Sequence, residues 1–378
     1  MIHEIAISNF KSLRDVRVKL SPLTVLIGRS GTGKSNFIDA IRFLKAVLLQ
    51  QHDGLVSHWQ GWPGTLSATC LGEEIELAFR LTFDIPGNDE RGIYEFGFRF
   101  GKNRRLSGYI REALRIGKKI CFAHDAGGWQ KQPGIVPLPQ PSGIMLPQLF
   151  GVPEIRTAYL VLTQGLSSFD FPGDVLCDPS KPRGTTLERG GENFIGVLAA
   201  IVNDISDFDR FKEMLAALKR INRSITTLDI PQDVSRVVVG HEVGPNRTLS
   251  LGLAQESEGF RRFLAHLIAL YQKPRGMTFL FEEPEKGIYP GALRVLVESF
   301  RRFIERERGQ VIMTTHSPEL LDCVKPEEIR VVEMHGYETK IGPVSHSQLE
   351  ALREHLLTTG ELLTADEARI SDAPQSAS

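Results

Sequence analysis

One short segment constrains this chain more than any other. Residues 28–35 read Gly-Arg-Ser-Gly-Thr-Gly-Lys-Ser and fit the pattern G-x-x-x-x-G-K-[ST] in full. In this pattern the glycines let backbone N–H groups turn inward around a phosphate, the lysine supplies a positive charge, and the hydroxyl ligates magnesium. An apolar run, Leu23–Ile27, precedes the segment, and Asn36–Gln50 follows it with apolar residues at helical spacing. A strand, a glycine loop and a helix N-terminus in this order predict a nucleotide site, with Lys34 on the β and γ phosphates and Ser35 on magnesium.

A second apolar strand ends in carboxylates. Met277–Phe281 is followed directly by Glu282 and Glu283. A carboxylate at a strand tip can hold magnesium through water, and its neighbour can orient the attacking water as a general base. We assign Glu282 to the metal and Glu283 to the water. A solvated charge cluster is the alternative for such a segment alone, and the upstream phosphate loop argues against it.

Two further segments carry candidate site residues. The strand expected at Gln310–Thr314 leads to His316, and in open α/β sheets chemistry gathers at the carboxyl ends of strands. From there His316 can reach the γ-phosphate or the attacking water, although a lone histidine is more often structural. Ser257 and Gly259 open a helix that leads into the acidic strand and form a possible second anion site. The alternative is an ordinary helix cap made by Ser257.

The rest of the chain alternates between strand and helix patterns. Alternating runs from Glu74 to about Gln130 predict a β-meander of three to five antiparallel strands. Prolines and glycines across Gly127–Pro153 predict a long loop or lid. We expect a frayed end at Ile370–Ser378. Further helices are expected at 192–205, 207–222, 257–273, 290–307 and 317–322, and further strands at 2–8, 236–239 and 329–334.

Composition limits the partners. The formal net charge of -1 gives no global attraction to nucleic acid or anionic lipid, so either contact needs a local basic patch. Residues 99–119 supply one candidate, with eight basic residues against the single acid Glu112. On a meander these can form a stripe that contacts DNA phosphates, or simply the solvated outer face of the strands. Four cysteines without a CxxC pair favour a reducing cytosol, and no apolar run is long enough to cross a membrane. We therefore expect a cytoplasmic protein with no membrane partner.

Taken together, these segments resemble the ABC ATPase superfamily. They look most like the predicted ATPases of the RecF and overcoming-lysogenization-defect type, a group of AAA-family ATPases. The likeness covers about residues 1–50, through ISNFKSL, LTVLIG and GRSGTGKSNFIDAI, and about 250–345, through S-x-G-F, FLFEEPEKGIYP and VIMTTHSPELLD. It is weaker in the β-meander and around Leu187–Leu198. The resemblance implies an α/β P-loop NTPase fold of ABC-ATPase head type, with a mixed sheet, an antiparallel β-meander lobe and a helical signature lobe.

The resemblance also implies domain limits. The head is expected to span residues 1–345. Its lobe I takes about 1–165 and 275–345, with the β-meander at about 74–130. The helical signature lobe takes about 166–274, and residues 346–378 form a C-terminal helix and a frayed tail.

The family pattern further implies ATP and Mg²⁺ as ligands and a dimer of heads. ATP on the phosphate loop of one subunit is capped by the signature segment of a second copy, here Ser257 and Gly259. A glutamine lines the metal in this superfamily, and Gln164 is the candidate. The residues expected to contact the nucleotide are Gly28, Arg29, Ser30, Gly31, Thr32, Gly33, Lys34, Ser35, Asn36, Ser257, Glu258 and Gly259.

Three positions depart from the family pattern. Ser30 stands where asparagine is frequent, Glu282 replaces the commoner aspartate, and Tyr289 takes a place usual for histidine. The first change affects a contact to the partner head, and the second lengthens the arm that holds the metal. None of them removes a group that hydrolysis requires, so slow turnover is compatible with this sequence.

Several functions fit such a head. The interval between Ser35 and Ser257 is too long for a transporter ATPase and too short for the coiled-coil arms of chromosome-maintenance proteins. We expect a stand-alone head without the nuclease domain of full overcoming-lysogenization-defect proteins. The leading hypothesis is an ATPase whose head closure gates a separately encoded effector or acts on DNA in anti-phage defence, a setting that rests on resemblance alone. The alternatives are a RecF-like DNA repair clamp and a slowly hydrolysing, ATP-locked structural scaffold.

Overall fold

The chain folds into two compact units. The first comprises Met1–Leu166, Pro326–Leu357 and Glu367–Ser378, and the second comprises Ser167–Lys325 and Thr358–Asp366. Residues 275–325, expected in lobe I, group with the second unit. The computed structural model describes residues 1–49, 62–70, 72–134, 138, 140–141, 143–177, 184, 186–204, 208–230, 237–273 and 277–371.

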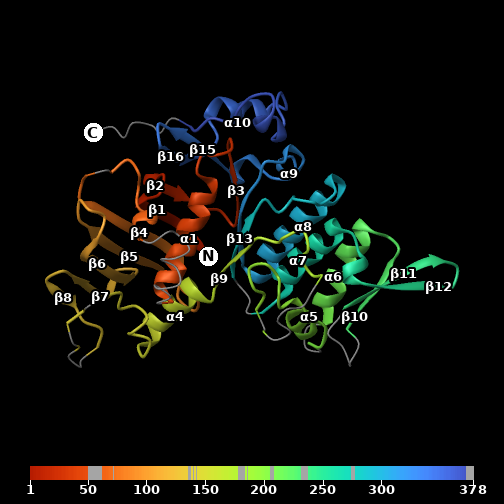
Figure 1. Cartoon of the computed structure of the whole chain (residues 1–378), viewed down its shortest axis with the longest axis horizontal. Helices are drawn as coiled ribbons and strands as arrows, with labels where there is room; N and C mark the ends of the chain where they lie inside the picture. The colour runs from red at the N-terminus through yellow and green to blue at the C-terminus, as the bar shows by residue number, and fades with distance from the viewer. Residues whose placement is uncertain are drawn as a thin grey trace. The chain divides into compact units, whose positions relative to one another are not determined.

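A seven-stranded antiparallel sheet dominates the first unit. Its strand order is β2-β1-β4-β5-β6-β7-β8, so the predicted meander of three to five strands is confirmed as β4 to β8 (Figure 1). The bounds are β1 (Ile2–Phe10), β2 (Leu13–Lys19), β4 (Ile75–Asp84), β5 (Arg91–Phe100), β6 (Leu106–Ile116), β7 (Lys119–Asp125) and β8 (Gly128–Lys131). Strand β4 buries every second residue, because a strand points successive side chains to opposite faces.

Aromatic residues join this sheet to a helix. Phe79 of β4 stacks on Phe96 of β5 with ring centroids 5.2 Å apart, and on Phe43 with centroids 5.7 Å apart. Phe43 belongs to α1 (Lys34–Leu48), whose apolar face is buried. The helix that follows the phosphate loop is thus fixed on the inner face of the meander by ring packing. Helix α4 (Pro153–Thr163) also packs on α1, and a short helix α3 (Trp62–Thr65) precedes β4.

The phosphate loop grows out of a buried parallel strand pair. Strand β3 (Leu23–Ile27) is entirely buried and pairs in parallel with β15 (Ile329–His335). Strand β15 pairs antiparallel with β16 (Glu338–Gly342) and is followed by α10 (His346–Arg353). Ile370, expected to begin a frayed end, instead forms a bridge with Val344. Residues 372–378 lie outside the described residues.

The second unit carries the acidic strand. Strands β13 (Thr278–Glu282) and β14 (Gln310–Thr314) pair in parallel, and β9 (Leu166–Phe169) begins at the boundary of the unit. Phe279 and Phe281 of β13 stack on Phe303 and Phe300, which form the buried face of a long helix. The helices are α5 (Phe194–Val202), α6 (Phe208–Ile221), α7 (Glu258–Tyr271), α8 (Pro290–Glu307) and α9 (Pro318–Leu321).

A three-stranded antiparallel sheet in the second unit was largely missed. It consists of β10 (Ile225–Asp229), β11 (Val238–Gly244) and β12 (Arg247–Gly252), and the β11–β12 hairpin extends away from the helices of its unit (Figure 1). Only a strand at 236–239 was predicted, and Arg236 lies outside the described residues. Strand β12 alternates apolar residues at Leu249 and Leu251, a short period-2 signal that the prediction did not use, and it is exposed over most of its length.

Candidate nucleotide-binding site

The backbone of the phosphate loop requires glycine at two points. Gly28 has φ +151°, and a Cβ there would lie 2.2 Å from the carbonyl oxygen of Val332. Gly33 has φ +104°, and its Cβ would lie 2.1 Å from Oγ1 of Thr339. Real Cβ atoms do not approach other atoms so closely, and L side chains rarely adopt these torsions. Strands β15 and β16 thus hold the loop in a form that only glycine permits.

Lys34 lies within the loop. Its Nζ donates hydrogen bonds to the carbonyl oxygens of Gly28 at 2.7 Å and Arg29 at 2.8 Å. Helix α1 begins at Lys34, and among the described residues no side chain caps its N-terminus. First-turn N–H groups of a helix have no partner within the helix and attract anions. Ser35, in this first turn, is exposed.

A chain of hydroxyl groups, which sequence reasoning missed, supports the loop from below. Oγ1 of Thr339 on β16 donates to the carbonyl oxygen of Thr32 at 2.8 Å and lies 2.7 Å from Oγ of Ser12. Nδ2 of Asn36 donates to the same Ser12 oxygen at 2.7 Å. The side chain of Asn36, expected on the nucleotide, therefore braces the loop against the β1–β2 turn. Ser12 belongs to ISNFKSL, one of the segments that carry the family resemblance, whereas no sequence signal marks Thr339, a buried polar residue of β16.

The outer side of the loop is open. Ser30 and Gly31 are exposed, and Arg29 pairs with Glu367 at 2.5 Å. Thr32 folds back, with its hydroxyl donating to the carbonyl oxygen of Arg29 at 2.9 Å. Of the loop residues predicted to contact the nucleotide, Ser30, Gly31 and Ser35 are thus exposed, whereas Thr32 and Lys34 are buried and bond to backbone carbonyl oxygens of the loop.

The acidic pair lies at the end of β13 in the second unit. Glu282 ends the strand, with Oε1 3.9 Å from the guanidinium of Arg189. Glu283 has φ +47°, and its N–H donates to the carbonyl oxygen and to Oγ1 of Thr314 at 3.1 and 3.2 Å. Its Oε2 lies 3.0 Å from Nζ of Lys286. A non-glycine residue held in the left-handed region costs about 1–3 kcal/mol and is typical of functional sites.

The predicted histidine lies at the end of the neighbouring strand. In the β13–β14 register Glu282 is opposite Thr314, so Glu283 and His316 follow adjacent strand ends. The N–H of His316 donates to Oε1 of Glu285 at 3.0 Å, and the hydroxyl of Thr315 donates to the same oxygen at 2.8 Å. The structure thus brings the acidic pair and His316 to one edge of the second unit.

The predicted signature residues open helix α7 in the same unit. Oγ of Ser257 accepts from the N–H of Phe260 at 3.3 Å, so Ser257 does act as the helix cap. Glu258 pairs with Arg262 at 2.9 Å. Gly259 packs flush against the loop after the acidic pair, because a Cβ there would lie 2.5 Å from the carbonyl oxygen of Gly287. Side-chain capping does not exclude anion binding by the exposed end of the helix.

Gln164 caps the C-terminus of α4 in the first unit and is exposed. No hydrogen bond joins it to another predicted site residue among those described. Two residues further on, the carbonyl oxygen of Leu166 accepts from Nζ of Lys45 at 2.5 Å. The stretch that contains Gln164 is therefore anchored to helix α1, which also carries Ser35.

Each unit carries donors whose chemistry suits a magnesium nucleotide. Backbone N–H groups and the ammonium of Lys34 suit phosphate oxygens, whereas the Ser35 hydroxyl and the Glu282 carboxylate suit magnesium. In the described part of the chain, no three His, Cys, Asp or Glu side chains gather as a metal site. Magnesium usually needs only one or two protein ligands besides phosphate oxygens and water.

The basic segment 99–119 is less uniform than its sequence indicated. Glu112, the one acid of the segment, is buried. Arg104 donates to the carbonyl oxygen of Ser67 at 2.6 Å, and Lys119 pairs with Glu154 at 2.7 Å. The expectation of a continuous stripe therefore reduces to separate exposed cations. These are Arg99, Lys102, Arg105, Arg111, Arg115 and Lys118.

The first unit holds a glycine loop between a buried strand and a helix, and the second holds a carboxylate-tipped parallel strand. Both features are typical of a P-loop NTPase fold of the ABC head type. Family comparisons agree. Residues 1–85 match the family described as "AAA ATPase domain", and residues 183–322 match "AAA domain, putative AbiEii toxin, Type IV TA system". Two segments of the chain are thus similar to AAA-type ATPase domains. None of the curated proteins compared with it matches significantly.

Solved structures show the same fold. One is an SMC head bound to the C-winged helix domain of ScpA, with a TM-score of 0.57 and 12% identity, covering 92% of this chain and 99% of that one. Another is the Smc head domain with an extended coiled coil bound to the C-terminal domain of ScpA, from Pyrococcus furiosus. Its TM-score is 0.53 at 12% identity, with 94% and 99% of the chains covered. At this identity the likeness establishes the SMC-head-like fold alone.

The described residues also contain no helix long and apolar enough to cross a membrane.

Proposed function

We propose that this protein binds and hydrolyses ATP with magnesium and closes face to face with a second copy of itself. The observation that carries the proposal is the phosphate loop, whose Gly28 and Gly33 have no room for a side chain and whose Lys34 lies within the loop. Glycine adopts these torsions readily, and without side chains the loop N–H groups can approach a phosphate closely.

Each predicted residue has a chemical role in this proposal. Lys34 and the loop N–H groups bind the β and γ phosphates, and Ser35 and Glu282 hold magnesium, with Gln164 as a further ligand. Magnesium, when bound, neutralises charge on the phosphate oxygens.

Glu283 acts as the general base. Its Oε2 is engaged by Lys286, which leaves Oε1 to accept the proton of the attacking water. His316 binds the γ-phosphate or orients that water.

The second copy completes the site. Ser257, Glu258 and Gly259 at the start of α7 cap the nucleotide on the partner's phosphate loop, using the positive end of the helix. The match to a family described by a toxin–antitoxin system supports a role in anti-phage defence, in which head closure gates a separately encoded effector or acts on DNA. A cytoplasmic location remains a prediction.

Two alternative functions make different predictions. A RecF-like DNA repair clamp is favoured if DNA binding depends on ATP. An ATP-locked structural scaffold is favoured if hydrolysis is negligible. Slow hydrolysis is compatible with Glu282 and Tyr289, which stand in place of the usual family residues.

Replacing Glu283 with Gln tests the proposal. The variant keeps the shape of the side chain but loses the base, so we expect unchanged ATP affinity, hydrolysis reduced at least about 100-fold, and a dimer that persists with ATP. Phosphate release and light scattering measure the two effects. The exposed variant Glu305→Gln on α8 serves as a control, with wild-type values expected. Unchanged turnover in Glu283→Gln would show that another group is the base.

A further inference from the structure

The loop Glu283–Tyr289 joins β13 to α8 and touches two other candidate site segments. Within the loop, the N–H of Lys286 donates to the Glu283 carbonyl oxygen and the N–H of Ile288 donates to the Glu285 carbonyl oxygen, both at 3.0 Å. These bonds make the loop two successive turns rather than an extended connection. A shift at one end is therefore transmitted to the other.

The middle of the loop holds the segment of His316. Oε1 of Glu285 accepts from the hydroxyl of Thr315 at 2.8 Å and from the N–H of His316 at 3.0 Å. Thr315 is fully buried, and its hydroxyl oxygen accepts in turn from the N–H of Ser317 at 3.0 Å. One carboxylate oxygen thus fixes the backbone on both sides of the His316 side chain, which itself is exposed.

The other carboxylate oxygen of Glu285, Oε2, does not hold the His316 segment. Oε2 is buried and lacks a hydrogen-bond partner among the described residues. An unsatisfied buried acceptor costs about 1–3 kcal/mol, and native proteins keep few of them. Its persistence here indicates that the carboxylate serves something other than stability.

The far end of the loop contacts the start of α7. Gly287 has φ +69°, and its carbonyl oxygen is so close to Gly259 that a Cβ on Gly259 would lie 2.5 Å away. A Cβ on Gly287 would in turn meet Oε1 of Glu258 at 3.0 Å. No side chain separates the two backbones, so a displacement of the α7 N-terminus reaches the loop directly.

We propose that Glu285 is a positioning residue that sets His316 for hydrolysis, and that its loop links His316 to the signature segment of the same subunit. The inference rests on the proposed ATPase function. A nucleotide held by the α7 N-terminus for the partner would then act, through Gly287 and Glu285, on the His316 of the subunit that caps it. Glu285 itself does not touch the nucleotide in this scheme.

Two pairs of variants test the proposal. Glu285→Gln keeps a carbonyl oxygen that can accept both bonds, whereas Glu285→Ala removes the acceptor. Thr315→Ser keeps the hydroxyl, and Thr315→Val removes it. We expect Glu285→Ala and Thr315→Val to lower kcat at least about tenfold, because each lost hydrogen bond is worth about one decade in rate. Their ATP affinity and KM should stay within about threefold of wild type. Glu285→Gln and Thr315→Ser should stay close to wild type in all three quantities. Hydrogen exchange at the amides of 314–317 should speed up in the Ala and Val variants only.

The outcomes separate this inference from the function on which it rests. If the wild-type protein neither binds nor hydrolyses ATP, the proposed function fails, and the inference about Glu285 fails with it. If it hydrolyses ATP and Glu285→Ala matches it in kcat, the inference is overturned. It is also overturned if Glu285→Ala loses ATP affinity or melts early while Glu285→Gln does the same, since that pattern marks a purely structural residue.

Discussion

At the scale of single residues, His266 on α7 is unusual for a histidine. It is buried among the rings of Phe171, Phe281 and Phe300, with centroid distances of 5.0, 5.1 and 6.3 Å. Burial among these rings, which removes it from water, lowers the pKa of His266 from 6.5 to about 4. The carbonyl oxygen of Arg262 accepts from its Nδ1 at 2.7 Å, which fixes the neutral ring as an Nδ1–H donor.

This histidine predicts how stability depends on pH. The folded protein holds His266 neutral down to pH about 4, whereas the unfolded chain takes up a proton from pH 6.5 downward. The neutral His266 therefore makes its full contribution to the free energy of unfolding above pH 6.5. This contribution, about 3 kcal/mol, is lost as the pH falls to about 4. Urea unfolding at pH 7 and pH 4.5 should show a smaller pH dependence for His266→Gln than for wild type. The exposed His346→Gln should keep the wild-type pH dependence, and an equal slope in all three proteins would refute the effect.

The alternation of strand β6 could have predicted that Glu112 is buried. Strand β6 alternates, so Glu112 shares the inward face with Leu114 and Ile116 and not the outward face with the basic residues. Its carboxylate accepts from the hydroxyl of Tyr94 at 2.8 Å and from the N–H groups of Met145 and Leu146 at 2.5 and 3.0 Å, and lies 2.8 Å from Nε2 of His124. The alternation predicts the inward position, but the partners come from segments that no sequence pattern places there.

At the scale of elements, the sequence was informative wherever an apolar period was strong. Helix α8 and strands β3 and β14 have the predicted bounds, because each has a buried face and a clear end. In β12 the period is short, because only Leu249 and Leu251 alternate, and the strand was not predicted. The candidate site was also predicted only in part. Motifs predicted the loop and the strand ends, whereas the contacts of Thr339 and Glu285 depend on tertiary pairing.

Strand β16 provides a test of the loop support. The hydroxyl of Thr339 bonds both the Thr32 carbonyl oxygen and Ser12, so its loss should let the phosphate loop relax. We expect Thr339→Val to weaken ATP binding about tenfold, equivalent to about 1.4 kcal/mol, and Thr339→Ser to stay within about twofold. Titration with a fluorescent ATP analogue measures both. Equal affinity in Val and Ser variants would show that the hydroxyl chain does not shape the site.

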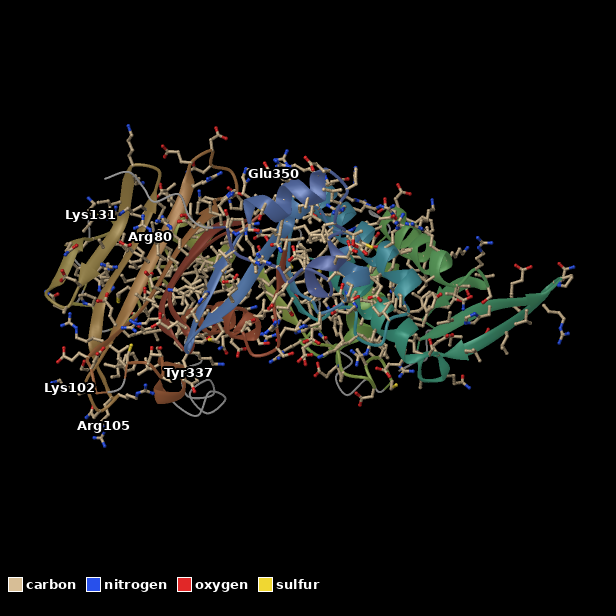
Figure 2. All side chains as sticks on the ribbon, turned by 90° about the horizontal axis from the view of Figure 1, so that it is seen from above. Arg80, Lys102, Arg105, Lys131, Tyr337 and Glu350 are labelled. Atoms are coloured by element: carbon tan, nitrogen blue, oxygen red, sulfur yellow. The ribbon has the colours of Figure 1, made fainter. Side chains whose placement is uncertain are left out.

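At the scale of the whole molecule, charge decides whether DNA is a partner. The net charge of -1 provides no general attraction, so any binding must be local and sensitive to single cations. Arg80 and Arg115 face the shared acid Glu95 at 3.3 and 4.0 Å. By contrast, Lys102 and Arg105 in the turn between β5 and β6 point away from the sheet into solvent (Figure 2).

This turn is therefore where a DNA-binding function should be lost first. Reversing Lys102 and Arg105 to Glu should weaken duplex binding in an electrophoretic shift assay and lower the salt dependence of log K by about 2, since each phosphate contact contributes about 0.9. A control with the same net charge, Lys131→Glu with Lys212→Glu, changes cations on β8 and α6 and should leave both quantities near wild type. Equal weakening by the control would mean that binding follows total charge and not this surface. If the wild-type protein binds no DNA with or without ATP, the DNA-acting functions, including the RecF-like clamp, are excluded, and the gated effector and the scaffold are left.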